Sequence, residues 1–278
     1  MQIIEWPQFL KDGLSSGDKP TSMTIGVFDG VHRGHQVLIE RIVRHDDRFT
    51  PVIITFRQNH KKARKGHGYW GDILSFRQKT AFIESLGAAI ILVIDFSESF
   101  RRLPGLEFIR LLEEHGNMGF LAVGSDFRCG YHLDTGAPAI QKRNALRGIP
   151  TDIVEALLEG SCPISSSRIR NAIAGGSLRE AASMLGRNYT ADISGAFVPS
   201  SGPGLTWDFA SSGQILPPLG SYPVLLHGRN GSDRTSLGTE ALIEPGIIRI
   251  PAAFAENTGG VDWEYVEFLS DSASSGCC

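Results

Sequence analysis

Two histidines in a glycine-rich stretch are the residues of this sequence best suited to chemistry. His32 and His35 end the string Gly-Val-Phe-Asp-Gly-Val-His-Arg-Gly-His, which covers residues 26–35. At a helix entrance, residues three apart share one face, and the glycines let the backbone approach a ligand closely. Free N–H groups and the dipole at a helix start favour an anion such as phosphate. The stretch predicts a phosphate site with two imidazole donors, or else a glycine turn with two incidental histidines.

The residues around this string indicate the elements that position it. The apolar run Met23 to Val27 predicts a strand, and the apolar residues after His35 recur at helical spacing: Leu38, Ile39, Ile42 and Val43. A strand therefore enters a helix through a tight glycine turn. The string contains neither G-x-x-x-x-G-K-[ST] nor G-x-G-x-x-G, so it is neither of the commoner glycine fingerprints.

The full string G-x-F-D-G-x-H-x-G-H is more specific than its histidines alone. It resembles the signature of the adenylyltransferase module of bacterial FAD synthetases, which belong to the nucleotidyltransferase superfamily. The resemblance implies catalytic roles for His32 and His35. It also implies nucleotide binding by Gly26, Phe28, Asp29, Gly30 and Gly34.

The chain that follows alternates predicted strands with predicted helices. Strands are expected at Val52 to Phe56, Ala89 to Ile94, Phe120 to Val123 and around Ile153. Amphipathic helices are expected from a capping box of Ser75 with Gln78 to Gly87, and from Gly105 to Glu114 with Gly116 closing the helix. This alternation predicts a parallel, doubly wound sheet, in which ligands lie beyond the carboxyl ends of the strands.

Two loops after predicted strands are therefore candidate binding segments. The string Gly124 to Gly130 resembles the family's G-x-[DN]-F-x-F-G with Cys129 in place of the second aromatic, although a plain turn is the alternative. The strand ending in Phe56 is followed by Arg57-Gln58-Asn59-His60, where the family commonly has T-F-x-P-H-P. The resemblance implies flavin binding by Phe56, Asp126, Phe127 and Arg128. The basic loop with Lys61, Lys62, Arg64 and Lys65 is either solvated or a flap over a polyphosphate.

A third motif combines serines with an arginine. Serine hydroxyls at a helix entrance cap the backbone and can also bind phosphate, and arginine adds charge and a forked donor geometry. The string from Ile164 to Arg170 matches the family's I-S-S-T-x-x-R, with serine in place of threonine at position 167. The resemblance implies nucleotide binding by Ser165, Ser166 and Ser167 and a catalytic role for Arg170, with a plain helix cap as the alternative. A second capping box, Ser177 with Glu180, begins the next predicted helix.

Composition changes after Tyr189, where short alternating apolar runs replace helical patterning. With 278 residues, two domains are expected: an adenylyltransferase domain at 1–188 and a β domain at 189–278. Strands are predicted at Gly195 to Val198, Tyr222 to Leu226, Ile247 to Ile250 and Trp263 to Leu269. The string L-P-P-L-G-S-Y-P-V resembles the riboflavin kinase barrel of bifunctional family members. The kinase signature P-T-A-N is missing, and Trp207 to Ser212 read W-D-F-A-S-S, which indicates a degenerate kinase-like domain.

Charge and cysteine content restrict the partners. A formal net charge of -3 gives no basic field for nucleic acid or an acidic membrane. The N-terminus lacks the pattern of a signal peptide, and we expect a cytoplasmic protein whose partners are small molecules. Cys129, Cys162, Cys277 and Cys278 have no metal-ligand or disulfide spacing. Neither the oligomeric state nor the role of the β domain follows from the sequence.

The resemblance implies an FMN adenylyltransferase, an enzyme that transfers AMP from ATP to FMN and releases FAD and pyrophosphate. Mg²⁺ is expected to accompany ATP, held largely by phosphate oxygens and water with Asp29 or Asp126 in reach. One alternative keeps the chemistry with another phosphorylated cofactor precursor as acceptor. The other is a non-catalytic regulator that binds a nucleotide or a flavin.

Overall fold

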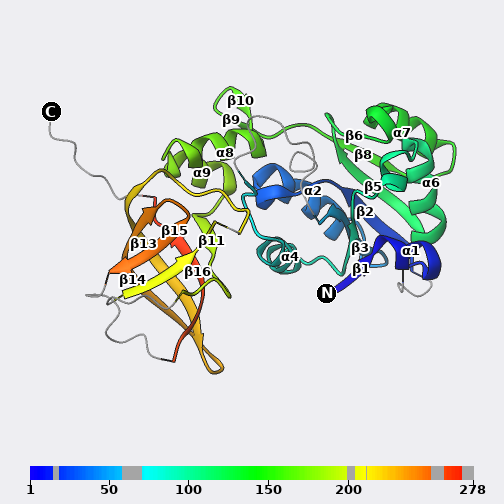
Figure 1. The fold of residues 1–278 in the computed structure, drawn as a ribbon. Helices are drawn as coiled ribbons and strands as arrows, with labels where there is room; N and C mark the ends of the chain where they lie inside the picture. Colours follow the sequence, from blue (N-terminus) through cyan, green and yellow to red (C-terminus); the bar gives the residue numbers. More distant parts are fainter. Residues whose placement is uncertain (15–18, 58–70, 199–203, 211, 252–259, 271–278) are drawn as a thin grey trace. The chain divides into compact units, whose positions relative to one another are not determined.

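The computed structural model describes residues 1–14, 19–57, 71–198, 204–210, 212–251 and 260–270 (Figure 1). Contacts divide the chain into two compact units, of which the first comprises Met1–His67 with Lys79–Ile164 and the second Gly68–Gln78 with Ser165–Cys278. The basic loop expected after Phe56 and the terminal cysteine pair lie outside the described residues. The boundary at residue 188 between two functional domains stays a prediction.

A six-stranded parallel sheet forms the centre of the first unit, which confirms the predicted fold class (Figure 1). The strand order is β1-β4-β3-β2-β5-β8. The strands are β1 (Gln2–Glu5), β2 (Thr21–Ile25), β3 (Thr50–Phe56), β4 (Ile90–Ile94), β5 (Met118–Gly124) and β8 (Thr151–Val154). Strand β1 was not expected, because a four-residue edge strand with mostly exposed side chains carries little apolar pattern.

Helices and short elements connect these strands. The helices are α1 (Trp6–Asp12), α2 (Arg33–Val43), α4 (Phe76–Ser85), α5 (Glu98–Arg101), α6 (Gly105–Gly116) and α7 (Ala137–Ala145), with short helices η1 (Asp29–Val31) and η2 (Tyr131–Leu133). Two hairpins, β6 (Arg128–Cys129) with β7 (Thr135–Gly136) and β9 (Leu158–Glu159) with β10 (Cys162–Pro163), complete the unit.

The structure confirms one predicted helix signal and corrects another. At the start of α4, the Gln78 backbone N–H donates to Ser75 Oγ at 3.1 Å and the Ser75 N–H donates to Gln78 Oε1 at 3.0 Å, which is a reciprocal capping box. Helix α6 continues through Gly116 and ends at Asn117, whose φ of 48° is left-handed. Gly116 is instead a packing position, since a Cβ there would lie 2.5 Å from Met23 Cε.

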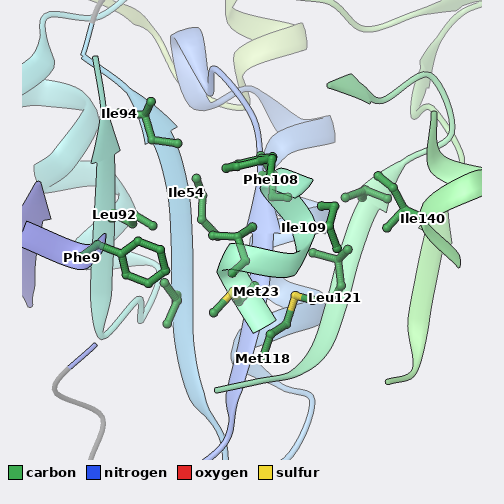
Figure 2. Close-up of a cluster of buried hydrophobic side chains, with 14 of the residues drawn as sticks. Phe9, Met23, Ile54, Leu92, Ile94, Phe108, Ile109, Met118, Leu121 and Ile140 are labelled. Atoms are coloured by element: carbon green, nitrogen blue, oxygen red, sulfur yellow. The ribbon is translucent and has the colours of Figure 1, made fainter. Parts of the chain in front are cut away.

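Apolar side chains of three helices pack on one face of this sheet (Figure 2). Helices α1, α6 and α7 contribute Phe9, Phe108 and Ile140 to the buried cluster that contains Ile54 of β3. Neighbouring strand residues point to opposite faces, so the buried Ile53 faces the other side. Helix α2 packs on β2, β3 and β5. Helices therefore cover both faces, as in a doubly wound fold.

The strand order reverses between β2 and β5. From β2 the chain continues through β3 and β4 on one side of the sheet, and β5 and β8 then add on the other side of β2. Ligands of such folds bind outside the carboxyl ends of the strands where the order reverses. The histidine turn follows β2 and the segment from Gly124 follows β5. Both predicted segments of the first unit therefore leave adjacent strands at the same end.

The second unit contains a six-stranded antiparallel sheet that curls as half a barrel (Figure 1). Its order is β11-β16-β13-β14-β15-β12. The strands are β11 (Tyr189–Asp192), β12 (Gly204–Asp208), β13 (Gly220–Asn230), β14 (Asp233–Glu244), β15 (Ile247–Pro251) and β16 (Asp262–Phe268). Helices α8 (Ser166–Ala174) and α9 (Leu178–Leu185) precede the sheet.

Two expectations for this unit were wrong. Gly195 to Val198 is no strand, and within that described segment only Phe197 forms an isolated bridge, to Trp207. The Ser177 side chain makes no capping hydrogen bond at the start of α9 among the described residues. The carboxylate of Glu180, which a capping box would use, lies 3.4 Å from Arg168 Nη2 and forms an ion pair instead.

Candidate functional site

The turn between β2 and α2 is held in an unusual backbone conformation. The Gly26 N–H donates to the Ile54 carbonyl at 3.0 Å. Phe28 and Val31 have φ values of 52° and 38°, in the left-handed region that glycine, here Gly30 at 80°, adopts more readily. Left-handed non-glycine residues cost roughly 1–3 kcal/mol each and cluster at functional sites. The Phe28 ring is fully buried, so its contribution to a ligand site is the position of its backbone.

His32 has a structural role that determines the position of its proton. It is the N-cap of α2, and its Nδ1 accepts a hydrogen bond from the His35 backbone N–H at 3.3 Å. A nitrogen that accepts cannot carry the proton, so the neutral ring is protonated on Nε2. His32 therefore presents a hydrogen-bond donor from the start of the helix.

The two imidazoles lie face to face. Their ring centroids are 3.6 Å apart with an interplanar angle of 16°, and the Phe28 ring contacts His35 edge-on at 5.1 Å. His35 Nδ1 is buried and has no hydrogen-bond partner among the described residues. Desolvation, with the nearby charges of His32 and Lys79, lowers the pKa of His35 well below its ordinary value. His35 is therefore neutral at neutral pH, and its Nδ1 is an unsatisfied polar atom.

Two glycines beside these rings leave little room for a side chain. A Cβ at Gly34 would lie 3.3 Å from Nδ1 and Cε1 of His32. A Cβ at Gly26 would lie 3.1–3.4 Å from three atoms of the Phe28 ring. Either side chain would press on a ring that forms the site. Gly26 and Gly34 thus allow the close packing of the turn.

The segment after β5 presents one acidic and one basic side chain. Asp126 is exposed, and Phe127 is half-buried against the apolar cluster of the unit. Arg128 Nε donates to the Leu133 carbonyl at 3.1 Å, and the intervening η2 turn has left-handed residues at His132 and Leu133. These contacts fix Arg128 beside a constrained turn.

Two further side chains near the strand ends pack against apolar neighbours. Phe56, at the end of β3, stacks on Phe96 with ring centroids 4.5 Å apart and an interplanar angle of 7°. Cys129 packs against the apolar cluster, and desolvation with the charge of Asp134 raises the pKa of its thiol to about 12. Cys129 is therefore an unreactive thiol that fills space.

The serine and arginine motif belongs to the second unit. Ser165 is the N-cap of α8, and its Oγ accepts from the Arg168 N–H at 3.3 Å. Ser166 is half-buried in the first turn and Ser167 is exposed. Arg170 is buried, and its Nε donates to the Gly71 carbonyl at 2.9 Å. Ser165 thus caps the helix as predicted, and at least one guanidinium nitrogen of Arg170 supports the backbone at Gly71.

A chelating metal centre does not occur in the described part of the chain, where no group of three or more His, Cys, Asp or Glu side chains could hold an ion. Of the two predicted aspartates, Asp29 is buried within η1 and Asp126 is exposed. Magnesium prefers to keep several waters and to bind nucleotide phosphates. Asp126 is the more accessible of the two carboxylates for such an ion.

Comparisons with known proteins place this arrangement in a family. The model of the FAD synthetase family matches residues 14–168, a range that includes both histidines and the serines of α8. This chain belongs to the FAD synthetase family. Its membership makes it a nucleotidyltransferase, and the α/β unit with the histidine turn is the part that carries the match.

Relatives of this FAD synthetase family member are known from several bacteria. The bifunctional riboflavin kinase/FMN adenylyltransferase of Escherichia coli (strain K12) is 31% identical over 214 residues, which span 74% of this chain and 68% of the relative. The enzyme of the same name from Bacillus subtilis (strain 168) is 28% identical over 219 residues, 73% of this chain and 66% of the relative.

A solved structure shares the fold. The crystal structure described as a macrolide-efflux protein from Streptococcus pneumoniae matches with a TM-score of 0.80 and 22% identity, covering 97% of this chain and 90% of that one. At this identity the likeness concerns the fold alone.

Among the described residues, no helix is long and apolar enough to cross a membrane.

Sequence reasoning missed one residue close to the histidines. Lys79 of α4 is buried, and its ammonium group contacts the glycine turn and the end of β3. A signal for it existed, because Lys79 is four residues from Ile83 and so lies on the apolar stripe of the helix. A lysine in that position requires polar partners inside the protein.

Proposed function

We propose that this chain is an FMN adenylyltransferase, which makes FAD and pyrophosphate from FMN and ATP. The observation that carries the proposal is the turn at residues 26–35, where a helix N-terminus, a donor on His32 and an unsatisfied His35 nitrogen meet at the carboxyl end of β2. Membership of the FAD synthetase family supports it. The relatives named for this activity support it as well.

The reaction requires alignment and charge neutralisation. A phosphate oxygen of FMN attacks the α-phosphorus of ATP, and the bond to the bridging oxygen breaks, so that its electron pair leaves with pyrophosphate. No bond to the enzyme is formed. Preorganised donors aimed at the developing negative charge are the main contribution that a protein can make. His32 Nε2–H, His35 and the start of α2 are assigned to that charge.

The remaining predicted residues are assigned by their chemistry. Ser165, Ser166 and Ser167 at the start of α8 bind nucleotide phosphate, and Arg170 adds positive charge there. This assignment rests on the order of the motifs along the sequence and on the helix cap at Ser165. Mg²⁺ accompanies ATP and neutralises phosphate charge.

The flavin is assigned to the segment after β5. Phe127 offers a half-buried ring for stacking, and Asp126 offers an exposed acceptor for hydroxyl groups. Arg128, fixed by the Leu133 carbonyl, places a positive charge in the same segment. Phe56 contributes apolar surface at the end of β3.

We also propose that the chain does not phosphorylate riboflavin. The two aromatic residues of the segment in place of P-T-A-N are committed to the core of the second unit, because Trp207 in β12 and Phe209 are buried. The Asp208 carboxylate accepts the Ala210 N–H at 2.9 Å and so stabilises its own turn. A kinase site needs side chains that face ATP and a flavin hydroxyl, whereas Trp207 and Phe209 face the protein interior and Asp208 binds its own backbone.

One experiment tests both the adenylyl transfer to FMN and the proposed absence of riboflavin phosphorylation. Purified protein is incubated with MgATP and either FMN or riboflavin, and the products are identified by chromatography and mass spectrometry. FAD and pyrophosphate are expected with FMN, and neither FMN nor FAD is expected with riboflavin. A folded protein that makes no FAD from FMN would remove the adenylyltransferase assignment, whereas FMN formed from riboflavin would reveal a divergent kinase.

A further inference from the structure

A buried ammonium group lies beneath the histidine turn. Lys79, on α4, is 6% exposed. Its Nζ donates to the Phe56 carbonyl at 2.7 Å, to Thr55 Oγ1 at 3.2 Å and to the Val27 carbonyl at 3.3 Å. A lysine with this burial needs such partners, because an isolated ammonium in an apolar environment would lose its proton or destabilise the fold.

The partners of Lys79 belong to the two segments that frame the site. Val27 lies in the glycine turn between β2 and α2, and Thr55 and Phe56 end the adjacent strand β3. Thr55 Oγ1 also donates to the Val27 carbonyl at 3.0 Å. The carbonyl of Val27 is therefore held by two donors, from α4 and from β3. It directly precedes the left-handed Phe28, whose conformation directs the chain into η1 and α2.

We propose that Lys79 is a positioning residue for adenylyl transfer, whose ammonium group fixes the Val27 carbonyl and thereby aims the turn and both imidazoles at the reacting phosphates. This inference rests on the proposed function of the same site. Lys79 acts through the turn, since its ammonium hydrogens are directed at backbone and hydroxyl oxygens of the protein.

The same ammonium group helps to keep His35 neutral. The ionisable groups that act on His35 are His32, stacked on it at the helix start, and Lys79, from α4, and both lower the pKa of His35 together with desolvation. Of the other charged groups on this turn, Arg33 pairs with Glu159 at 2.8 Å and Asp29 is buried in η1. Removing the charge of Lys79 raises the pKa of His35, although desolvation keeps it below the ordinary value.

The test uses Lys79→Met, which keeps the length of the side chain and removes its charge and donors. A displacement of about 1 Å in a catalytic group costs roughly 10²-fold in rate, so kcat for FAD formation is expected to fall by about that factor while circular dichroism shows a folded protein. Lys142→Met is the matched control, because Lys142 is an exposed lysine of the same unit. It is expected to have the wild-type kcat.

A second readout does not depend on catalysis. Titration of the imidazole resonances by NMR is expected to show a higher pKa for His35 in Lys79→Met than in the wild type, and no change in Lys142→Met. This measurement remains decisive even if the wild type makes no FAD, so failure of the inference and failure of the proposed function can be told apart. An unchanged pKa of His35 in Lys79→Met would overturn the inference that the charge of Lys79 lowers this pKa.

A milder variant covers the case in which Lys79→Met does not fold. Thr55→Val keeps the shape of the side chain but removes one acceptor of Lys79 and one donor to Val27. We expect a folded protein whose kcat falls several-fold with a smaller change in KM for ATP. A folded Lys79→Met or Thr55→Val variant with the wild-type kcat would show that Lys79 serves stability alone, and would overturn the inference.

Discussion

The two functions of His32 can be separated by substitution. Its Nδ1 caps α2 through the His35 N–H, and its Nε2–H is assigned to the phosphate charge. His32→Ala removes both functions. His32→Asn replaces the ring by a side chain whose carbonyl oxygen is among the preferred N-cap groups, but which is too short to place a donor where Nε2 lies.

The expected magnitudes differ for the two functions. Loss of a cap costs typically ~1 kcal/mol of stability, which for a protein of this size corresponds to about 2–4 °C in Tm. Loss of one preorganised donor costs about 2.7–4 kcal/mol of transition-state stabilisation, or roughly 10²–10³ in rate. His32→Ala should therefore lose both stability and rate, whereas His32→Asn should lose rate at nearly unchanged Tm.

The assay combines turnover with thermal unfolding. FAD formation from saturating FMN and MgATP is followed by chromatography at 25 °C, and Tm is measured by circular dichroism. A loss of ~1 kcal/mol leaves a protein with an ordinary stability of about 5–15 kcal/mol almost entirely folded, so a hundredfold loss of turnover cannot come from unfolding. Turnover near the wild type in His32→Asn would refute the donor role and leave His32 as a helix cap.

Three further predictions concern neighbouring groups. Gly34→Ala should lower kcat at least tenfold at nearly unchanged Tm, because its Cβ would press on the His32 ring at 3.3 Å; wild-type kcat would show that the ring tolerates displacement. Because the folded pKa of His35 is depressed, the unfolded state binds more protons below about pH 6.5, and stability should fall as pH falls through that window. His35→Gln should flatten this part of a pH series of denaturant titrations, and an unchanged slope would contradict the shift. Arg170→Ala should lower Tm, because the buried Gly71 carbonyl loses its donor, and should also raise KM for ATP; a lower Tm with unchanged KM would assign Arg170 to structure alone.

Local patterns predicted the histidine turn and the start of α4 well. The strand, glycine turn and helix at the histidines follow from glycine spacing and apolar periodicity, and the structure has β2 and α2 there. The capping box of Ser75 with Gln78 also forms as predicted. Such features depend on residues within one or two turns of each other, so the sequence carries the information locally.

Features that depend on distant partners were not predictable in the same way. Glu180 pairs with Arg168 across the α8–α9 turn rather than completing a cap with Ser177. Strands β12 and β14 were missed, because the former follows glycine and proline and the latter carries charged and polar residues on its exposed face. The buried contacts of Lys79 with the turn and of Arg170 with Gly71 join residues far apart in sequence. Their positions come from tertiary packing, which a single sequence does not display.

The most direct test of the adenylyltransferase assignment follows one phosphorus atom. The protein is incubated with FMN and ATP labelled at the α-phosphate, and the label is traced after chromatography, with the His32→Asn variant measured in parallel. The label should appear in FAD, with unlabelled pyrophosphate released and at least a hundredfold lower rate in the variant. Label that stays in ATP, or that leaves as AMP without FAD, would contradict transfer of the adenylyl group to FMN.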